Sequence, residues 1–401
     1  MKGFFPATSL QVISTNHMLP QCGKCGLLDG CRTPKMPVAG LGKRGIMIIG
    51  EAPGANEDAV GRPFVGMSGE RLQAALRKAG VELFRDCWVT NALSCRPPDN
   101  KIDSDKKIEY CRPLVLKAIT EKMPTSIILV GQKAVLSVIG HLWKKSIGEM
   151  KRWAGLHIPV REWNCWVTPV YHPSFLMRMH DDIVLERLFD ESIRKAVKKT
   201  ERPWKQPRYD FTGDCKILMN QHEANEIERI ANNGLVAWDY ETTTLNPDSK
   251  DADIVSCSIS DGKESVAYPF TGNFIYATKK VLTDSSVKKI GANAKFEERW
   301  TRRKLGIRVR GWTWDTVLAA HAIDNRNGIT SVKFQAFLRL GVADWSSSIT
   351  PYLEGKSGIK PNKIKELDLR KLLTYNALDS LFEYRIAVLQ AKELGVKLAG
   401  S

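Results

Sequence analysis

The stretch Gly50–Gly69, GEAPGANEDAVGRPFVGMSG, decides the fold of the first half of this chain. It follows a short apolar run, Ile46–Ile49, which predicts a buried strand. It precedes Glu70–Ala79, whose apolar residues are spaced as on one face of a helix. A strand, a loop and a helix in this order are typical of an α/β site, where ligands bind at the carboxyl ends of the strands. An ordinary connection needs one turn glycine and a cap, whereas this one holds five glycines and two prolines in twenty residues. We therefore predict a functional site in this loop, although it lacks the spacing of a P-loop or a dinucleotide-binding fingerprint.

The size and charge of the chain limit what it can be. Its 401 residues favour two domains over one. Its formal net charge of +16 favours a polyanionic partner, most simply nucleic acid, over a charge that only keeps the surface soluble. No apolar run reaches the length of a membrane span, and Met1–Leu10 lacks the apolar core of a signal peptide. We expect no membrane partner and a cytoplasmic location.

Nine cysteines without an export signal indicate a reducing compartment, where thiols more often bind metals or lie buried than form disulfides. Cys22 and Cys25 form a CxxC pair. Cys95 and Cys111 flank a polar loop with fifteen residues between them. Four thiolates from two distant segments could hold zinc or an iron–sulfur cluster, and a redox pair is also compatible with the CxxC spacing. Cys31 is an additional thiol without an assigned role.

Strands and helices alternate through the first half. The strand predictions are Cys87–Thr90, Ser126–Val130 and Trp163–Thr168, and the helix predictions are 108–122 and 132–143. This order predicts a parallel sheet with helices on both faces. Functional residues should then lie at strand ends, where Asn91 follows the second strand and His172 follows the last.

These motifs together resemble the family 4 (iron–sulfur) uracil-DNA glycosylases. The matching pieces, in order, are GEAPG, ED, GRPFVG, TN, CRPP and HPSFLMR, and the resemblance covers Gln21 to Arg178. It implies the uracil-glycosylase α/β/α sandwich. It also implies a structural 4Fe–4S cluster on four cysteines: Cys22, Cys25, Cys95 and Cys111.

The resemblance also implies roles for the loop residues. A uracil flipped out of DNA would stack on Phe64, pair with Asn91 and receive a hydrogen bond from His172 as its anion leaves. Glu51 and Glu57 would act near the sugar, where they could orient water or stabilise positive charge. Ala52 stands where better-known uracil glycosylases carry a water-activating Asp.

A further segment resembles a loop that inserts into the DNA. It is Leu176–Arg178, and Arg178 is counted with the substrate-binding residues.

The second half begins with a strand, Leu235–Asp239, that leads into DYET. Asp239 and Glu241 are two residues apart and so point to one face of the strand, where two hard cations could share their oxygens. Apolar runs at Ile254–Ser260 and Ser265–Tyr268 predict an antiparallel meander. Three more motifs follow: NAKFE ending at Glu297, WDT around Asp315, and YNALD from Tyr375 to Asp379.

DYET, NAKFE, WDT and YNALD in this order resemble the 3′–5′ proofreading exonuclease domain of family A DNA polymerases, of the DEDD class and tyrosine subtype. The resemblance covers Lys216 to Leu394 and implies an RNase H-like domain with a mixed sheet. Its ligands for two Mg²⁺ or Mn²⁺ ions would be Asp239, Glu241, Glu297 and Asp379, with Glu297 at a position where the family most often has Asp. Tyr375 would orient the attacking water, and Asp315 would support the site.

The expected organisation is therefore a glycosylase domain (1–200), a basic linker (201–214) within a Lys- and Arg-rich region, and an exonuclease domain (215–401). This order resembles the front part of certain bacteriophage family A polymerases, which would place the protein in the host cytoplasm. We expect DNA as partner, together with a polymerase that is a separate subunit or a C-terminal continuation. The alternative is an accessory subunit without catalysis, whose glycosylase fold only grips template DNA.

Overall fold

The computed structural model describes residues 19–179, 182–207, 211–343, 345–353 and 361–398. The chain divides into two compact units: the first contains the described residues up to Pro207 together with Gly341–Ala343, and the second contains the other described residues. Met1–Leu10 and residues 208–210 of the predicted linker lie outside the described residues. Within the described ranges, no helix has both the length and the apolar character to cross a membrane.

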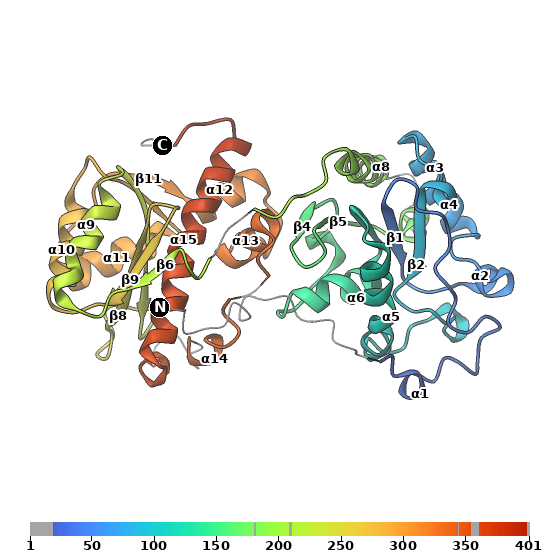
Figure 1. Cartoon of the computed structure of the whole chain (residues 1–401), viewed down its shortest axis with the longest axis horizontal. Coiled ribbons are helices and arrows are strands. Elements are labelled where there is room, and N and C mark those ends of the chain that lie inside the picture. Colours follow the sequence, from blue (N-terminus) through green and yellow to red (C-terminus); the bar gives the residue numbers. More distant parts are fainter. Residues whose placement is uncertain (1–18, 180–181, 208–210, 344, 354–360, 399–401) are drawn as a thin grey trace. The chain divides into compact units, whose positions relative to one another are not determined.

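The first unit is built on a five-stranded sheet with the order β2-β1-β3-β5-β4 (Figure 1). Its strands are β1 (Ile46–Gly50), β2 (Cys87–Asn91), β3 (Ser126–Val130), β4 (Ile158–Val160) and β5 (Cys165–Val170). Strands β2, β1, β3 and β5 are parallel, which confirms the predicted sheet. The sequence reading missed β4, which is antiparallel to β5. Residues 161–164 join the two strands, and so short a connection cannot make the crossover that a parallel pair needs.

Helices cover both faces of this sheet, as expected. The helices of the first unit are α1 (Cys22–Cys25), α2 (Ala55–Val60), α3 (Met67–Lys78), α4 (Leu83–Asp86), α5 (Lys106–Lys122), α6 (Gln132–Leu142), α7 (Pro173–Arg178) and α8 (Ile183–Lys198). Leu72 and Leu76 of α3 pack with Phe189 of α8 against Ile46 and Ile48 of β1. Alternate strand residues point to the opposite face, where α6 contacts β1 and β3.

The second unit is built on a six-stranded mixed sheet with the order β11-β10-β7-β8-β9-β6. Its strands are β6 (Cys215–Ile217), β7 (Leu235–Thr242), β8 (Ile254–Ser260), β9 (Ser265–Pro269), β10 (Lys288–Gly291) and β11 (Trp312–Asp315). The predicted antiparallel meander is confirmed as β7-β8-β9. Strands β10 and β11 extend it in parallel with β7, and the short β6 pairs in parallel with β9.

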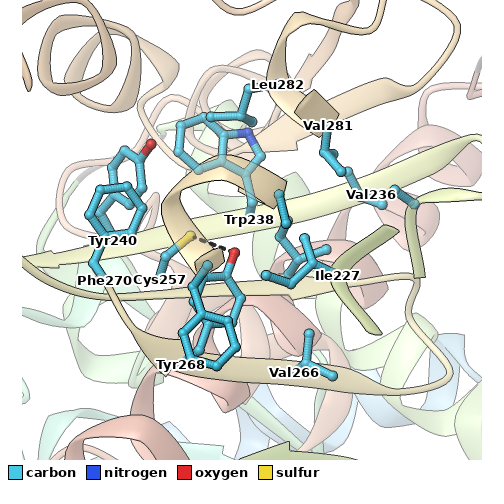
Figure 2. Close-up of a cluster of buried hydrophobic side chains, with 14 of the residues drawn as sticks. Ile227, Val236, Trp238, Tyr240, Cys257, Val266, Tyr268, Phe270, Val281 and Leu282 are labelled. Atoms are coloured by element: carbon cyan, nitrogen blue, oxygen red, sulfur yellow. Dashed lines mark hydrogen bonds between the residues drawn. The ribbon is translucent and has the colours of Figure 1, made fainter. Parts of the chain in front are cut away.

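The helices of the second unit are α9 (Asn225–Ala231), α10 (Gly272–Thr283), α11 (Ala294–Leu305), α12 (Thr316–Ile323), α13 (Val332–Leu340), α14 (Thr350–Leu353) and α15 (Leu369–Glu393). Figure 2 shows the aromatic core on one face of the sheet, which contains Trp238 and Tyr240 of β7 and Tyr268 of β9. The hydroxyl of Tyr268 donates a hydrogen bond to Sγ of Cys257 at 3.3 Å. Because side chains alternate along a strand, the carboxylates of Asp239 and Glu241 face the other side, which α15 covers. The packing of the core thus fixes where these acids point.

Candidate active sites

A single carboxylate holds the Gly50–Gly69 loop in shape. Oε1 of Glu57 accepts hydrogen bonds from the backbone N–H groups of Val65 at 3.0 Å and Gly66 at 2.9 Å, and Oε2 accepts one from Gly54 at 3.1 Å. Both oxygens therefore bind the loop itself. The contacts assign Glu57 a bracing role, and its expected action on the sugar stays a prediction.

Two glycines make room for the predicted uracil-binding side chains. A β-carbon on Gly50 would lie 2.3 Å from Oδ1 of Asn91 and 2.6 Å from Cζ of Phe64, so both side chains converge over this glycine. A β-carbon on Gly69 would lie 2.0 Å from the carbonyl oxygen of Phe64. The structure thus brings Phe64 and Asn91 together, with Phe64 held in the left-handed backbone region at φ 56°.

The ring of His172 is oriented by the first turn of α7. His172 caps this helix, and its Nδ1 accepts a hydrogen bond from the backbone N–H of Ser174 at 3.2 Å. An N–H group can only donate, so the neutral ring carries its proton on Nε2. Burial lowers the pKa of His172, against the opposing effect of Glu51. The ring is therefore neutral at physiological pH and presents an Nε2–H donor.

The other predicted residues of this site lie around the same strand ends. Oε1 of Glu51 accepts a hydrogen bond from the backbone N–H of Lys133 at 3.1 Å, in the first turn of α6, where a helix favours negative charge. Arg178 is exposed at the end of α7. The segment Leu176–Arg178, expected as a loop, is the last turn of this short helix, which starts at Pro173, a residue favoured at the first helical position.

The four predicted cluster cysteines line one cavity, together with Leu27, Leu93 and Leu114. Sγ of Cys95 accepts the backbone N–H of Lys35 at 3.2 Å, and Sγ of Cys111 accepts that of Ser94 at 3.4 Å. Burial raises the pKa of the Cys95 thiol to about 12 in the metal-free chain, an effect that a bound cation reverses. Cys31 packs beside this group and donates to the carbonyl oxygen of Leu28.

Three carboxylates of the second unit meet as the motifs predict. Among the described residues, the one group with ligand atoms all within 4.8 Å of one another is Asp239, Glu241 and Asp379. Burial, and then the nearby charge of Asp379, raises the pKa of Asp239. Within the described ranges, Oε2 of the buried Glu297 has no hydrogen-bond partner, and burial raises the pKa of Glu297 as well. Three of the four predicted acids are thus brought together, and Glu297 lies outside the tight group, within electrostatic range of Asp239.

Three residues that the sequence reading missed orient this site. Nζ of Lys333 donates to the hydroxyl of Tyr375 at 2.6 Å and lies 3.9 Å from Oδ2 of Asp379. Nε1 of Trp345 donates to Oδ1 of Asp379 at 2.7 Å, and Nδ2 of Asn376 donates to Oδ2 of Asp239 at 2.8 Å.

Only one of these three residues carried a signal in the sequence. Asn376 lies inside the YNALD motif, so the motif itself could have indicated it.

Asp315, which was expected to support the site, accepts a hydrogen bond from the backbone N–H of Ala294 at 2.9 Å. This bond holds the start of α11, the helix that carries Glu297.

Two family models match this chain. The uracil DNA glycosylase superfamily matches residues 40–200, and a 3′–5′ exonuclease domain matches residues 216–388. The type-4 uracil-DNA glycosylase of Pyrobaculum aerophilum is 35% identical over 172 residues, which are 41% of this chain and 83% of that protein. DNA polymerase I of Chloroflexus aurantiacus is 26% identical over 171 residues, which are 41% of this chain and 18% of that protein. The solved structure of Brucella melitensis NrnC is 19% identical, with 45% of this chain and 81% of that chain covered at a TM-score of 0.35.

The two folds and their sites define a hydrolase with a glycosylase unit followed by an exonuclease unit. Through its first unit, the chain belongs to the family of type-4 uracil-DNA glycosylases.

Proposed function

We propose that the first unit excises uracil from DNA and that the second digests DNA from the 3′ end. The convergence of Phe64 and Asn91 over Gly50, together with a His172 ring held as an Nε2–H donor after β5, carries the first half of the proposal. The triad of carboxylates around Asp239 carries the second half.

Uracil excision needs the bond between the base and C1′ of the sugar to break, with water supplying the new hydroxyl. In our proposal the ring of Phe64 stacks on the flipped base and the amide of Asn91 pairs with its polar edge. Nε2–H of His172 donates to the oxygen on which negative charge develops, which stabilises the leaving anion. The carboxylate of Glu51 stabilises the positive sugar or orients the water, and Glu57 keeps the loop in place. Arg178 contacts the DNA.

A 4Fe–4S cluster fits the four cysteines better than a zinc ion does. A single zinc ion with bonds of about 2.3 Å would draw its sulfurs close together. The described cysteines form no such tight group and instead surround a cavity, where two of the sulfurs accept backbone N–H groups. A bound cluster would tie the α1 segment to the loop after β2 and to α5. Iron analysis of anaerobically purified protein should give about four irons per chain, and stoichiometric zinc without iron would contradict the assignment.

Exonuclease action rests on Asp239, Glu241 and Asp379, with Glu297 nearby, as ligands of two Mg²⁺ or Mn²⁺ ions. When bound, such ions stabilise the attacking and leaving oxygens of phosphodiester hydrolysis. Burial, followed by the charge of Asp379, raises the pKa of Tyr375, so the phenol stays neutral. Since Lys333 can only donate to its oxygen, the phenol acts as a donor in its turn, and the Asp379 carboxylate is an acceptor within its reach. In our proposal this donor orients the attacking water beside Asp379.

One gel assay tests both activities. A 5′-labelled oligonucleotide with a single uracil is incubated with and without excess chelator. We expect an alkali-labile break at the uracil in both lanes and shortening from the 3′ end only with divalent metal. His172→Ala should lose most of the base excision and keep the shortening, whereas Asp239→Ala should do the reverse. The absence of alkali-labile product, or degradation that survives chelation, would contradict the respective half of the proposal.

We also propose that the chain acts with a DNA polymerase, of the kind that bacteriophages encode. The similarity of its second unit to part of a DNA polymerase I supports this idea. Co-purification from the native source, followed by mass spectrometry, would test it. Recovery of the chain with no polymerase activity in any fraction would count against it. A protein that binds uracil-containing DNA without releasing uracil would favour the accessory-subunit alternative.

A further inference from the structure

Glu383 is a buried acid of the second unit to which neither the motifs nor the family match assigns a role. It lies four residues after Asp379 on α15 and therefore on the same side of this helix. Its side chain is 1% exposed, and its Oε2 has no hydrogen-bond partner in the described part of the chain. A buried carboxylate oxygen without a partner is strongly unfavourable, so this position calls for a compensating group.

The surroundings of Glu383 add negative charge. Its carboxylate interacts electrostatically with those of Asp239, Glu297 and Asp379. Lys333, a cation close to these acids, already contacts the Tyr375 hydroxyl and Asp379. An apolar residue would fill the same space at lower cost, which indicates that the acid has a use.

The positions of the acids suggest that use. Asp239, Glu241 and Asp379 are close enough together to share one cation. Glu297 lies outside this group, and its buried Oε2 has no partner among the residues that the structure describes. Two unpartnered carboxylate oxygens, on α11 and α15, thus lie within electrostatic range of Asp239. Oxygen ligands of this kind suit Mg²⁺ and Mn²⁺.

We propose that Glu383 is a fifth acidic residue of the exonuclease site and acts with Glu297 in binding the second divalent cation. This inference rests on the proposed exonuclease function. Glu383 raises the affinity of the site for that cation. The Glu297 side chain, which is longer than the Asp usual at its position, contributes to binding the same cation.

Mn²⁺ binding to the full-length protein tests the inference without an activity assay. Bound Mn²⁺ is counted by room-temperature EPR for wild type, for Glu383→Gln and for a control, Glu366→Gln, which removes the same charge from an exposed side chain. We expect two Mn²⁺ ions on wild type and on the control. On Glu383→Gln we expect one ion at unchanged affinity and a second whose affinity falls at least tenfold.

The outcomes separate this inference from the function on which it rests. If wild type binds no Mn²⁺, the proposed exonuclease site is wrong. If wild type binds two ions and Glu383→Gln holds both with unchanged affinity, Glu383 is only a neutral acid in the core and the inference is overturned. Should Glu383→Gln lose the melting transition of the second unit, Glu383→Asp, which keeps the charge and withdraws the oxygens, is judged by the same criterion.

Discussion

Replacing Gly69 with Ala should damage the uracil site from outside it. Gly69 lies inside α3, and an alanine β-carbon there would lie 2.0 Å from the carbonyl oxygen and 2.3 Å from the carbonyl carbon of Phe64. Because both atoms belong to the backbone, the clash cannot be relieved by rotating a side chain. The Phe64 backbone must move by roughly 1 Å to restore ordinary contact, and misplacement of this size can cost about 100-fold in rate.

The effect on stability has two opposing parts. Alanine in place of a helical glycine stabilises by up to about 1 kcal/mol, whereas overpacking costs about 1–3 kcal/mol. Gly140 in α6 provides a matched control, because a β-carbon there would approach no atom closer than 3.4 Å. We expect Gly140→Ala to keep full activity and to raise the melting temperature of the first unit. Gly69→Ala should retain the fold, melt at or below the wild-type temperature and release uracil about 100-fold more slowly.

Single-turnover uracil release and thermal melting, measured side by side, provide the test. The iron content of each variant shows whether the rest of the unit is intact. If Gly69→Ala matches Gly140→Ala in both rate and melting temperature, the close approach of helix α3 to the Phe64 backbone does not control the site, and the reasoning is refuted.

Three further predictions follow from individual side chains. His157 is partly buried with its Nδ1 hydrogen-bonded to Thr168, and loss of hydration lowers its pKa from 6.5 to about 4. Folding stability should therefore be lost as pH falls from 6.5 towards 4, by at most about 3 kcal/mol, and urea unfolding of His157→Asn should show a flatter pH profile in this range. Burial lowers the pKa of His172 below 6.5, so the midpoint of the acid-side decline in uracil release should lie below pH 6.5. A midpoint above pH 6.5 would contradict the neutral donor. Lys333→Met removes a charge-assisted hydrogen bond to Tyr375, which is typically worth about 1.5–3 kcal/mol, so 3′ digestion should slow about 10- to 100-fold while uracil release is unchanged.

Local sequence was sufficient for the central strands of both sheets. Ser126–Val130 and Ile254–Ser260 are contiguous runs of mainly apolar residues, and the structure gives strands with those same bounds. The edge strand Ile158–Val160 was missed, because it has three residues and a central proline, which only an edge position tolerates. This segment becomes a strand because it pairs with the neighbouring β5, and its own sequence does not indicate that pairing.

The residues of the candidate sites also differ in whether local sequence could predict them. The acids and the cysteines lie in short motifs, so sequence alone could indicate them. The brace that Glu57 forms could not be predicted, because it depends on where the backbone of Val65 and Gly66 turns back towards α2. The residue type of Glu57 suggested a catalytic acid, whereas in the folded loop both of its carboxylate oxygens accept hydrogen bonds from the backbone.

The exonuclease site shows why motifs reveal the acidic residues of a site more readily than the cationic residue that balances their charge. Asp239 and Glu241 are fixed by strand alternation, since Trp238 and Tyr240 must enter the aromatic core on the other face (Figure 2). Their cationic neighbour Lys333 comes from α13, more than ninety residues later, where one lysine among apolar residues looks like any surface residue of a helix. Acids gathered in this way repel one another, so the metal-free protein is stabilised by Lys333 and the metal-bound protein by its cations. Lysine and metal therefore act on the same excess of negative charge, and removing Lys333 should leave the site more dependent on bound metal for its stability.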